Sequence, residues 1–479
     1  MRILGREHPR SWGRREFLKA SCRGLAALAA TGTALSWLAA EASTQEPWDE
    51  LPRILDRIKL PQFPAREFEA AKFGAVGDGN FDCTPAFADA ITACNKAGGG
   101  TVVVPKGTFL SGAIRLKSHV NLRLDSGATI RFSRDPAKFP IVLTRFEGVE
   151  LMNYSPFIYA LEEENIGISG SGTLDGNADA EHWWSWKGSP GRSSEISHTQ
   201  DADRKRLFAM SESRVPVEQR VFGPGHFLRP NFIQPYRCKN VLIEGVTLLH
   251  SPMWEVHPVL SSNVIVRGVT INSSGPNNDG CNPESCSDVL IENCFFNTGD
   301  DCIAIKSGRN EDGRRVNVPS QNIVVQNCRM KDGHGGVTIG SEVSGGIRNI
   351  FAQNCEMDSP HLFSALRIKN NAMRGGDIEH IFARNIKVGQ VSMAGISIDF
   401  YYEEGKAGKF TPIVRNVQVQ NLTTHEAKYA VYLRGFKHAP IEQVALSNCD
   451  FEGVQNPNVI EDVKNISFSD VRINGKFVS

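Results

Sequence analysis

Three short polar motifs contain the residues of this sequence that are best suited to acid–base chemistry. They are Asn277-Asn278-Asp279-Gly280, Gly299-Asp300-Asp301-Cys302 and Gly333-His334-Gly335-Gly336. Aligning the first two motifs on Cys281 and Cys302 stacks Asp279 on Asp300. His334 falls at the same position of its repeat unit as Asp300. Because neighbouring strands lie about 4.8 Å apart, stacked motifs would bring three carboxylates and an imidazole into one patch.

Such a patch would favour proton transfer. Crowded carboxylates cannot all ionise easily, so the pKa of at least one of them should rise. A protonated carboxylic acid beside carboxylates is what hydrolysis of a glycosidic bond requires. The alternative is structural, because Asp and Asn are also common in turns and in calcium sites. Three aligned motifs with basic residues nearby favour the catalytic interpretation.

Basic residues gather on the strands that follow the motifs. These strands are predicted at 302–306, 336–340, 365–369, 395–399 and 430–434, with the second and fourth positions apolar and inward. Their outward positions include Lys306, Arg367, Lys369, Asp399, Tyr432 and Arg434. The whole chain is neutral, with 53 Lys+Arg and 53 Asp+Glu. Cations concentrated on one strip therefore predict an anionic substrate, against the alternative of an ordinary solvated face.

A nine-residue unit of Asn or Asp followed by alternating apolar residues recurs along the chain. Copies begin at Asn165, Asn240, Asn263, Asp288, Asn322, Asn349, His380, Asn416, Gln443 and Asn465, with a looser copy near Val120. A fixed core with drifting spacing indicates the coils of a solenoid, with loops of variable length on one side.

Two columns of the repeat predict how each coil turns. The fifth position holds Gly245, Gly268, Asn293, Asn327, Asn354, Asn385, Asn421, Asn448 and Asp470. These residue types tolerate a left-handed backbone, which predicts one bend per coil. The sixth position is uniformly apolar and should point inward. The pattern predicts an all-β fold, a single-stranded right-handed parallel β-helix, with its handedness taken from the general crossover preference.

Residues 84–98 predict an N-terminal capping helix over the first coil. Thr84 suits the N-cap, Phe87, Ile91 and Cys94 share one face, and Gly98 suits the end of the helix.

The cysteines allow two interpretations. Cys294, Cys328, Cys355 and Cys449 occupy the inward sixth column, where free thiols act as small apolar groups. An exported protein could instead use a disulfide framework, and pairing of Cys83 with Cys94 or of Cys281 with Cys286 stays open. No CxxC pair or His cluster has the spacing of a zinc site.

The first 42 residues are typical of an export signal. Arg14-Arg15 precede a weakly hydrophobic run from Gly24 to about Ala40, and Ala40-Glu41-Ala42 fits a cleavage site. This predicts a twin-arginine signal and a periplasmic or secreted protein. The alternative is a membrane anchor, but the run is short of the ~20 residues that span a bilayer. Residues 43–66 predict a linker with a short helix, and 67–479 one catalytic β-helix domain. Zero net charge argues against a nucleic-acid partner, and we expect no stable membrane insertion.

The polar motifs resemble the signature of the polygalacturonases, family 28 of the glycoside hydrolases. The matching pieces are Asn277-Asn278-Asp279, Gly299-Asp300-Asp301, Gly333-His334-Gly335 and Arg367-Ile368-Lys369, together with segments 73–79 and 172–176. The resemblance implies hydrolysis of α-1,4-galacturonosyl bonds in pectin, with inversion and without a metal or other cofactor. The partner would be a pectic polysaccharide or oligogalacturonate, and we expect a monomer.

The resemblance also implies a role for each residue of the site. Asp300 resembles the general acid, Asp279 and Asp301 the pair that activates water, and His334 the residue that keeps the acid protonated. Arg367 and Lys369 resemble the cations that bind a substrate carboxylate. Substrate binding is also expected of Asn277, of Lys306 on the cationic strip, and of Tyr402 or its neighbour Tyr401 as an aromatic sugar platform.

Two residues depart from the family pattern. Asn278 stands where Thr is common, and Asn282 stands where a further Asp is frequent, which leaves some substrate contacts open. The expected stacking also conflicts with the carboxylate spacing of about 6.5–9.5 Å usual in inverting glycosidases. Spacing alone would favour retention, whereas the resemblance implies inversion.

An insertion from about 178 to 230 contains Trp183, Trp184, Trp186, Arg192 and His198. It could wall off one end of the groove and favour attack from a chain end, or simply pack on the coils. Alternative functions are a rhamnogalacturonan hydrolase, a calcium-dependent pectate lyase and a non-catalytic carbohydrate-binding β-helix.

Overall fold

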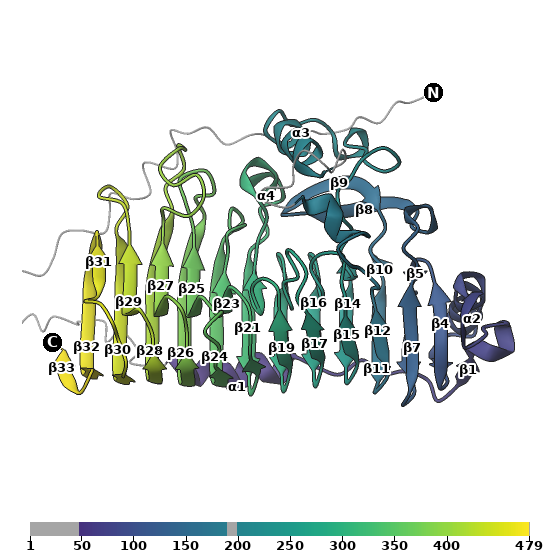
Figure 1. The fold of residues 1–479 in the computed structure, drawn as a ribbon, viewed down its shortest axis with the longest axis horizontal. Helices are drawn as coiled ribbons and strands as arrows, with labels where there is room; N and C mark the ends of the chain where they lie inside the picture. Colours follow the sequence, from purple (N-terminus) through teal and green to yellow (C-terminus); the bar gives the residue numbers. More distant parts are fainter. Residues whose placement is uncertain (1–46, 189–198, 479) are drawn as a thin grey trace, which may run out of the picture. The chain divides into compact units, whose positions relative to one another are not determined.

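The computed structural model describes residues 47–188 and 199–478. Short parallel strands of successive coils pair in register, which confirms the predicted right-handed parallel β-helix (Figure 1). The predicted export signal, residues 1–42, lies outside the described residues. Among the described helices, none combines the length and the apolar character needed to cross a membrane.

The strands fall into a large sheet and a smaller face. The large sheet contains β1 (Glu67–Glu69), β2 (Asp78–Asp82), β3 (Gly100–Val104), β4 (Gly107–Ser111), β6 (Val120–Leu124), β7 (Ala128–Phe132), β11 (Glu164–Gly170), β12 (Thr173–Asp175), β14 (Lys239–Glu244), β15 (Thr247–Leu249), β16 (Ser262–Arg267), β17 (Thr270–Ser273), β18 (Ser287–Glu292), β19 (Phe295–Thr298), β21 (Ser320–Gln326), β22 (Arg329–Met330), β24 (Ile347–Met357), β26 (Asp377–Gln390), β28 (Ile413–Glu426), β30 (Ile441–Phe451), β32 (Val463–Ile473) and β33 (Lys476–Val478).

The smaller face carries the predicted site. Its strands are β5 (Ile114–Arg115), β10 (Ile158–Leu161), β13 (Ile233–Tyr236), β20 (Ile303–Ile305), β23 (Gly335–Ile339), β25 (Ser364–Lys369), β27 (Ala394–Asp399), β29 (Tyr429–Arg434) and β31 (Val459–Glu461). Parallel bridges from Ile233 through Val256 and Cys281 to Ile303 join the two parts of this face.

Each repeated coil bends at two left-handed residues, not at one. The predicted fifth column is confirmed, with φ of +55° at both Asn293 and Asn327. The first residue of each unit is also left-handed, as at Asn322 (φ +56°) and Asn349 (φ +56°). Asn349 Nδ2 donates to Asn322 Oδ1 at 3.1 Å, so amide side chains at these bends are bonded between coils. Asn serves here because it tolerates this conformation and can bond to its copy in the next coil.

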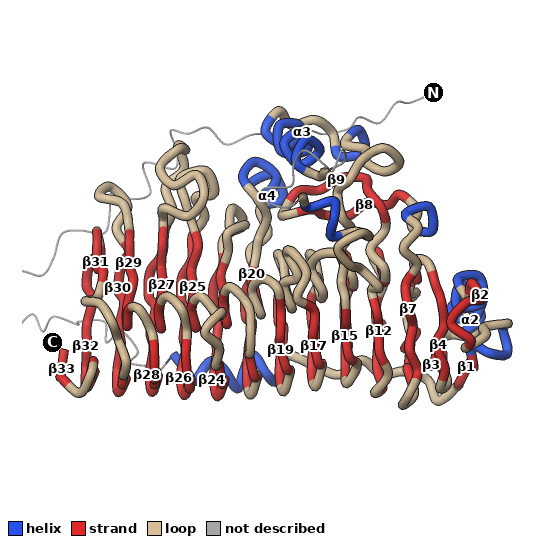
Figure 2. The backbone as a smooth tube through the Cα atoms, in the orientation of Figure 1, coloured by secondary structure: helices blue, strands red, loops and turns tan. Residues whose placement is uncertain are grey.

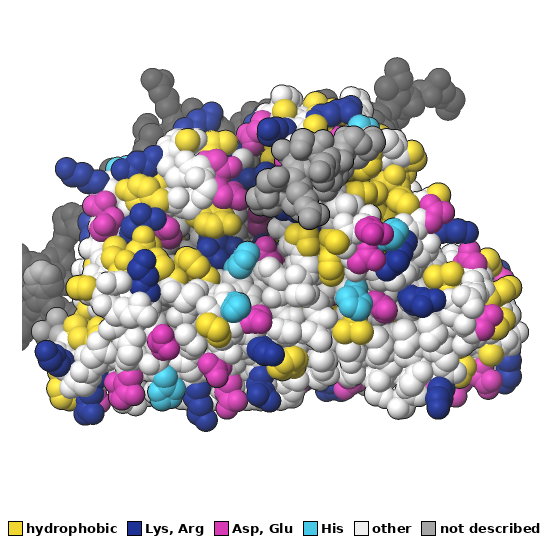
Figure 3. Space-filling model, in the orientation of Figure 1, with side chains coloured by type: hydrophobic (Ala, Val, Ile, Leu, Met, Phe, Trp, Pro, Cys, Tyr) yellow, Lys and Arg dark blue, Asp and Glu magenta, His cyan; other side chains and the backbone are white. Residues whose placement is uncertain are grey.

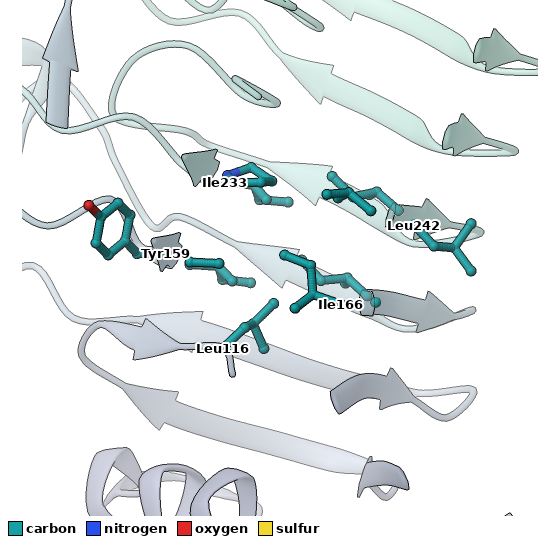
Figure 4. A pocket seen from close by; sticks show the side chains of 12 residues that line it. Leu116, Tyr159, Ile166, Ile233 and Leu242 are labelled. Carbon is teal, nitrogen blue, oxygen red and sulfur yellow. The ribbon is translucent and has the colours of Figure 1, made fainter. Parts of the chain in front are cut away.

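The interior of the coils is apolar and closely packed. The sixth-column side chains are buried, and all ten cysteines of the described residues are free and buried, so the two open disulfide pairings are not formed in this structure. Figure 4 shows how side chains from neighbouring coils, among them Leu116, Ile166 and Ile233, meet around a small apolar cavity of about 10 Å³.

Helices cover surfaces that the coils leave open. Helix α2 (Thr84–Lys96) packs Phe87 and Ile91 on the core, which confirms the capping helix. The predicted N-cap is wrong by one residue, because Thr84 is the first helical residue and Cys83 is the N-cap. Asp82 Oδ1 accepts the Thr84 N–H at 3.0 Å. Helix α1 (Glu50–Arg57) and Trp48 cover outward apolar side chains of the large sheet.

A separate group of elements stands over the smaller face. It consists of the antiparallel hairpin β8 (Ile141–Phe146) and β9 (Val149–Tyr154) with helices α3 (Asp201–Glu212) and α4 (Asn310–Val316) (Figure 2). Buried ion pairs fix this group. Arg145 Nη1 on β8 lies 2.7 Å from Glu284 Oε1 in the bridged part of the face, and Arg220 Nη1 lies 2.8 Å from Asp312 Oδ1 on α4.

Candidate active site

The three predicted acids converge. Carboxylate oxygens of Asp279, Asp300 and Asp301 lie within 4.8 Å of one another, although the residues come from two coils. Asp279 and Asp301 are buried, and Asp300 is partly exposed. The turns that precede β20 and its bridged neighbour therefore bring the three acids into one patch, as predicted.

The predicted register of the motifs is wrong by one residue. Cys281 pairs with Ile303 and not with Cys302, so Asp279 lies opposite Asp301 and not opposite Asp300. The two cysteines are both buried but occupy different columns. Cys302 belongs to the turn, where its Sγ donates to the Asp332 carbonyl at 3.2 Å.

Asp300 forms a pair with His334, as predicted from their positions in the repeat. His334 Nδ1 lies 2.9 Å from Asp300 Oδ1, and Ile303 pairs with Val337, which fixes the register of the two turns. The Asp301 N–H donates to the same Oδ1 at 3.0 Å. The other oxygen, Oδ2, lies 3.4 Å from Asn277 Nδ2 and lines the same pocket.

Asp301 is held by a lysine two coils away. Lys369 Nζ donates to Asp301 Oδ2 at 2.6 Å, and both side chains are buried. Arg367 Nη1 lies 3.6 Å from the other oxygen, Oδ1, which is buried and accepts no hydrogen bond from a described residue. One oxygen of Asp301 is thus fixed, and the other remains able to accept a proton.

Asp279 is surrounded by donors. Asn282 Nδ2 donates to Asp279 Oδ2 at 2.9 Å, and Lys306 Nζ lies 3.6 Å from the same oxygen. Lys306 also donates to Glu342 Oε2 at 3.0 Å and is buried. These contacts favour a role for Lys306 in neutralising Asp279 over direct binding of substrate. Asn282, which departs from the family pattern, orients the same carboxylate.

The three acids have different proton affinities. Burial, followed by the charge of Asp300, raises the pKa of Asp279 well above its usual value. Burial acts in the same direction on Asp300, but the hydrogen bond and charge of His334 outweigh it and lower the pKa of Asp300 to about 2. The same hydrogen bond raises the pKa of His334. The expected rise in one carboxyl pKa is therefore present, at Asp279. The expectation for His334 is not met, because His334 favours the ionised form of Asp300 and does not keep this carboxyl protonated.

Buried hydrogen bonds fix the first motif, Asn277-Asn278-Asp279. Asn278 is fully buried, accepts from Gly275 N at 2.8 Å and donates to the Met253 carbonyl at 2.9 Å. Arg229 Nη2 donates to Asn277 Oδ1 at 2.7 Å and is itself buried. Arg229 was not predicted. It belongs to the end of the insertion, and no spacing rule connects it to the motif.

The two candidate tyrosines have different surroundings. Tyr402 lines the pocket of the three acids, with its ring centre 5.2 Å from Lys369 Nζ and 5.6 Å from Arg367 Cζ. Tyr401 instead packs on Phe436, with ring centres 5.1 Å apart. Of the two tyrosines, Tyr402 is therefore the one that lines this pocket, together with Trp254.

A charged wall that the sequence did not predict completes the pocket. The pocket encloses about 270 Å³, and eight of the nine predicted site residues line it: Asn277, Asp279, Asp300, Asp301, Lys306, His334, Lys369 and Tyr402. We define the charged wall as the other charged lining residues, Glu147, Lys187, Arg204, Glu342 and Glu403. Arg367, the ninth predicted residue, contacts the group through the His334 carbonyl at 3.2 Å.

Ion pairs hold the charged wall together. Arg204 on α3 lies 2.6 Å from Glu147 in the β8–β9 turn. Buried Arg309 lies 3.3 Å from both Glu342 and Glu403. The wall therefore combines segments that are far apart in the sequence.

The insertion both packs on the coils and contributes to the pocket. Trp183 is buried against Phe139 and Phe157, and Trp184 Nε1 donates to the Ser251 carbonyl at 2.7 Å. Its charged residues Lys187 and Arg204 line the pocket. Arg192 and His198 lie outside the described residues.

The acid cluster has enough oxygen donors to hold a divalent cation. Its charge is already compensated by Lys369 at 2.6 Å and Lys306 at 3.6 Å, and His334 occupies an oxygen of Asp300. Ammonium groups at these positions would repel a cation. The donor set therefore fits proton transfer better than it fits a metal.

Comparison with known proteins agrees with this geometry. The profile described as glycosyl hydrolases family 28 matches residues 225–472, which include every predicted site residue. A second profile, described as rhamnogalacturonase A/epimerase, pectate lyase-like, matches residues 68–134, outside the acid cluster.

Individual relatives cover most of the chain. A probable polygalacturonase of Vitis vinifera is 28% identical over 83% of this chain and 77% of its own length. An exo-poly-alpha-D-galacturonosidase of Dickeya chrysanthemi is 26% identical, covering 84% of this chain and 70% of its own. The crystal structure of a hyperthermoactive exopolygalacturonase from Thermotoga maritima superposes with a TM-score of 0.87 at 46% identity, covering 90% of this chain and 97% of that one. The fold, the acid cluster and these matches together show that the chain belongs to family 28 of the glycosyl hydrolases.

Proposed function

We propose that this glycoside hydrolase cleaves α-1,4-galacturonosyl bonds of pectin or polygalacturonate, with inversion and from a chain end. The observation that carries the proposal is the union of three acids with two cations: Lys369 touches Asp301, and Arg367 lies 3.6 Å from it. Acids alone would suit any sugar, but Arg367 and Lys369 add recognition of a sugar carboxylate. The polygalacturonase names of the relatives support the same substrate.

In the proposed reaction, Asp300 gives a proton to the oxygen of the leaving sugar through Oδ2. His334 Nδ1, bonded to Oδ1, holds the Asp300 side chain in place and stabilises the carboxylate that forms when Asp300 has given up its proton. Asp279 and Asp301 hold a water molecule between them and remove its proton as its oxygen attacks the anomeric carbon. One proton is thus donated and one is taken up; afterwards the aspartate that took the proton of the water releases it to solvent, and Asp300 regains one proton from solvent.

Attack from a chain end is supported by the charged wall. Glu147 and Arg204 reach the pocket from elements above the coils, and both belong to one ion pair at 2.6 Å. A pocket that is walled by these elements suits one terminal sugar better than the middle of a polymer. The name of the Thermotoga maritima relative, an exopolygalacturonase, supports this mode of action.

A product time course on polygalacturonate tests this function. We expect saturated monogalacturonate from the earliest time points, with the same rate in excess EDTA. An early ladder of oligomers would contradict attack from the end. Unsaturated products or loss of activity with EDTA would indicate a calcium-dependent lyase, and binding without any product would indicate a non-catalytic β-helix. A higher kcat/KM on rhamnogalacturonan than on polygalacturonate would indicate a rhamnogalacturonan hydrolase.

The activity should fall on the alkaline side of its pH profile. The pKa of His334 is raised, so its proton is present below this value and is lost as the pH rises through it. Without this proton, the carboxylate that Asp300 leaves after donation loses its charged hydrogen-bond donor. The measurement is kcat/KM on a galacturonate oligomer as a function of pH. A profile that stays flat into the alkaline range would contradict this account.

We further propose export through the twin-arginine route to the periplasm or the medium, and action as a monomer. Arg14-Arg15 before the apolar run support export, and one chain supplies every residue of the pocket. Replacement of both arginines by lysine should leave active enzyme inside the cell. Unchanged export in a fractionation assay would contradict this route.

A further inference from the structure

We propose that Tyr432 and Arg434 form an outer sugar position, which binds a galacturonate residue of the leaving part of the substrate beyond the cleaved bond. This inference rests on the proposed function and deepens it. It concerns residues that lie outside the pocket of the three acids.

Strand register places the outer sugar position in line with the substrate cations. Arg367 on β25 is in register with Ser397 on β27, which is in register with Tyr432 on β29. Lys369 is likewise followed by Asp399 and then by Arg434. Two strand spacings amount to about 10 Å. A chain that leaves the pocket along the coils therefore passes over Tyr432 and Arg434.

The Arg434 guanidinium is held in a fixed orientation. Nη2 donates to Asp399 Oδ2 at 2.7 Å, and Cζ lies 5.1 Å from the ring centre of Tyr432 and 4.9 Å from that of Tyr401. The side chain remains 28% exposed. A planar guanidinium that is already oriented loses little freedom when it binds a carboxylate.

Aromatic rings provide the second element of recognition. The rings of Tyr432 and Tyr429 lie 5.3 Å apart and are partly exposed, so they offer apolar faces on which a sugar ring can rest. In Figure 3, hydrophobic side chains, which include tyrosine, lie beside Lys and Arg at the upper left, over the coils of β25 to β29.

The charges around this position favour an anion. The acids Asp399 and Glu461 flank Arg434 in the neighbouring coils. Two lysines add positive charge near the same tyrosines. Lys406 Nζ lies 5.1 Å from the centre of the Tyr401 ring, and Lys428 Nζ lies 5.5 Å from the centre of the Tyr429 ring. Since Asp399 is already paired with Arg434, the two lysines outnumber Glu461 among these five charged groups.

The test compares digalacturonate, which cannot reach the outer sugar position, with hexagalacturonate, which can. In Arg434→Ala and in Tyr432→Ala, kcat/KM on hexagalacturonate should fall about three- to tenfold, whereas kcat/KM on digalacturonate should not change. Tyr432→Phe should retain the behaviour of the parent because it keeps the ring. Arg415→Ala is the matched control, since Arg415 forms a similar pair between coils, 2.6 Å from Glu379, on the large sheet.

The inference would be overturned if the ratio of kcat/KM on hexagalacturonate to kcat/KM on digalacturonate were the same in the variants as in the parent. This includes the case in which kcat/KM falls equally on both substrates. If Arg434→Ala unfolds at a lower temperature than the parent, Arg434→Lys replaces it in the test. Lysine keeps a cation beside Asp399 but lacks the planar guanidinium, so the ratio of kcat/KM on hexagalacturonate to kcat/KM on digalacturonate should still fall. A parent enzyme that releases no galacturonate from either oligomer would instead refute the proposed function, so the two failures are distinguishable.

Discussion

Replacement of Asp300 by asparagine should lower kcat by about 10²–10⁴-fold, the usual contribution of a general acid. Asparagine keeps the shape of the side chain but cannot deliver a proton. Asp300 Oδ2 faces the pocket, and among the described residues its one hydrogen-bond donor is Asn277, at 3.4 Å, so the substrate should still fit. We therefore expect a kcat effect with little change in the affinity for oligogalacturonate.

The matched control for this variant is Asp377→Asn, which changes an exposed aspartate at the start of β26. Its kcat should equal that of the parent. Thermal unfolding of both variants separates a catalytic loss from a folding defect. Retention of more than a tenth of the parental kcat by a folded Asp300→Asn enzyme would remove Asp300 from its role as the acid.

Replacement of Lys369 by alanine should have the second large effect. It removes the 2.6 Å partner of Asp301 and one of the two cations proposed to bind the sugar carboxylate. Truncation of one member of a buried charge pair costs about 2–5 kcal/mol, so kcat/KM should fall by at least about 30-fold. KM should rise for galacturonate oligomers. Burial opposes the charge of Lys369, but Asp301 outweighs it and raises the pKa of Lys369, so the cation is present throughout the working range.

Lys387→Ala is the control for charge alone, because Lys387 is highly exposed on the large sheet, at 3.7 Å from Glu356. An unchanged KM in Lys369→Ala would count against the cation as a substrate contact. A fall in kcat alone would leave Lys369 as a positioning residue for Asp301.

Periodicity explains why so much of the site could be predicted from the sequence. The bend residues and the inward apolar column recur in every copy, so Asp300 and His334 could be matched by counting from the start of each unit. Counting also placed Lys369 on the same face. Counting failed where a residue type was taken as a marker of position. Cys281 and Cys302 looked equivalent, but Cys281 forms a parallel bridge with Ile303, whereas Cys302 lies in the turn before β20.

The charged wall could not be predicted for a physical reason. Glu147, Arg204 and Glu403 come from a hairpin turn, a helix and a loop, and none of these segments belongs to the repeat. Their positions depend on ion pairs such as that of Arg204 with Glu147, which no local pattern encodes. Likewise, the alternation of residues predicted an outward position for Lys306 but not its partner Glu342, 3.0 Å away.

The close packing of the acids makes the stereochemistry of cleavage informative. The oxygens of the three acids lie within 4.8 Å of one another, closer than the separation of about 6.5–9.5 Å usual for inverting glycosidases. The proposed reaction has water, held by Asp279 and Asp301, attack the anomeric carbon directly. It therefore requires inversion, whereas a covalent intermediate on one of the acids would give retention.

The most direct test is to record proton NMR spectra during the first turnovers on trigalacturonate, before the anomers equilibrate. Direct attack by water predicts that the sugar released from the α-linked substrate first carries the β configuration at its new reducing end. Initial formation of the α anomer would contradict the assignment of Asp279 and Asp301 as the residues that activate water.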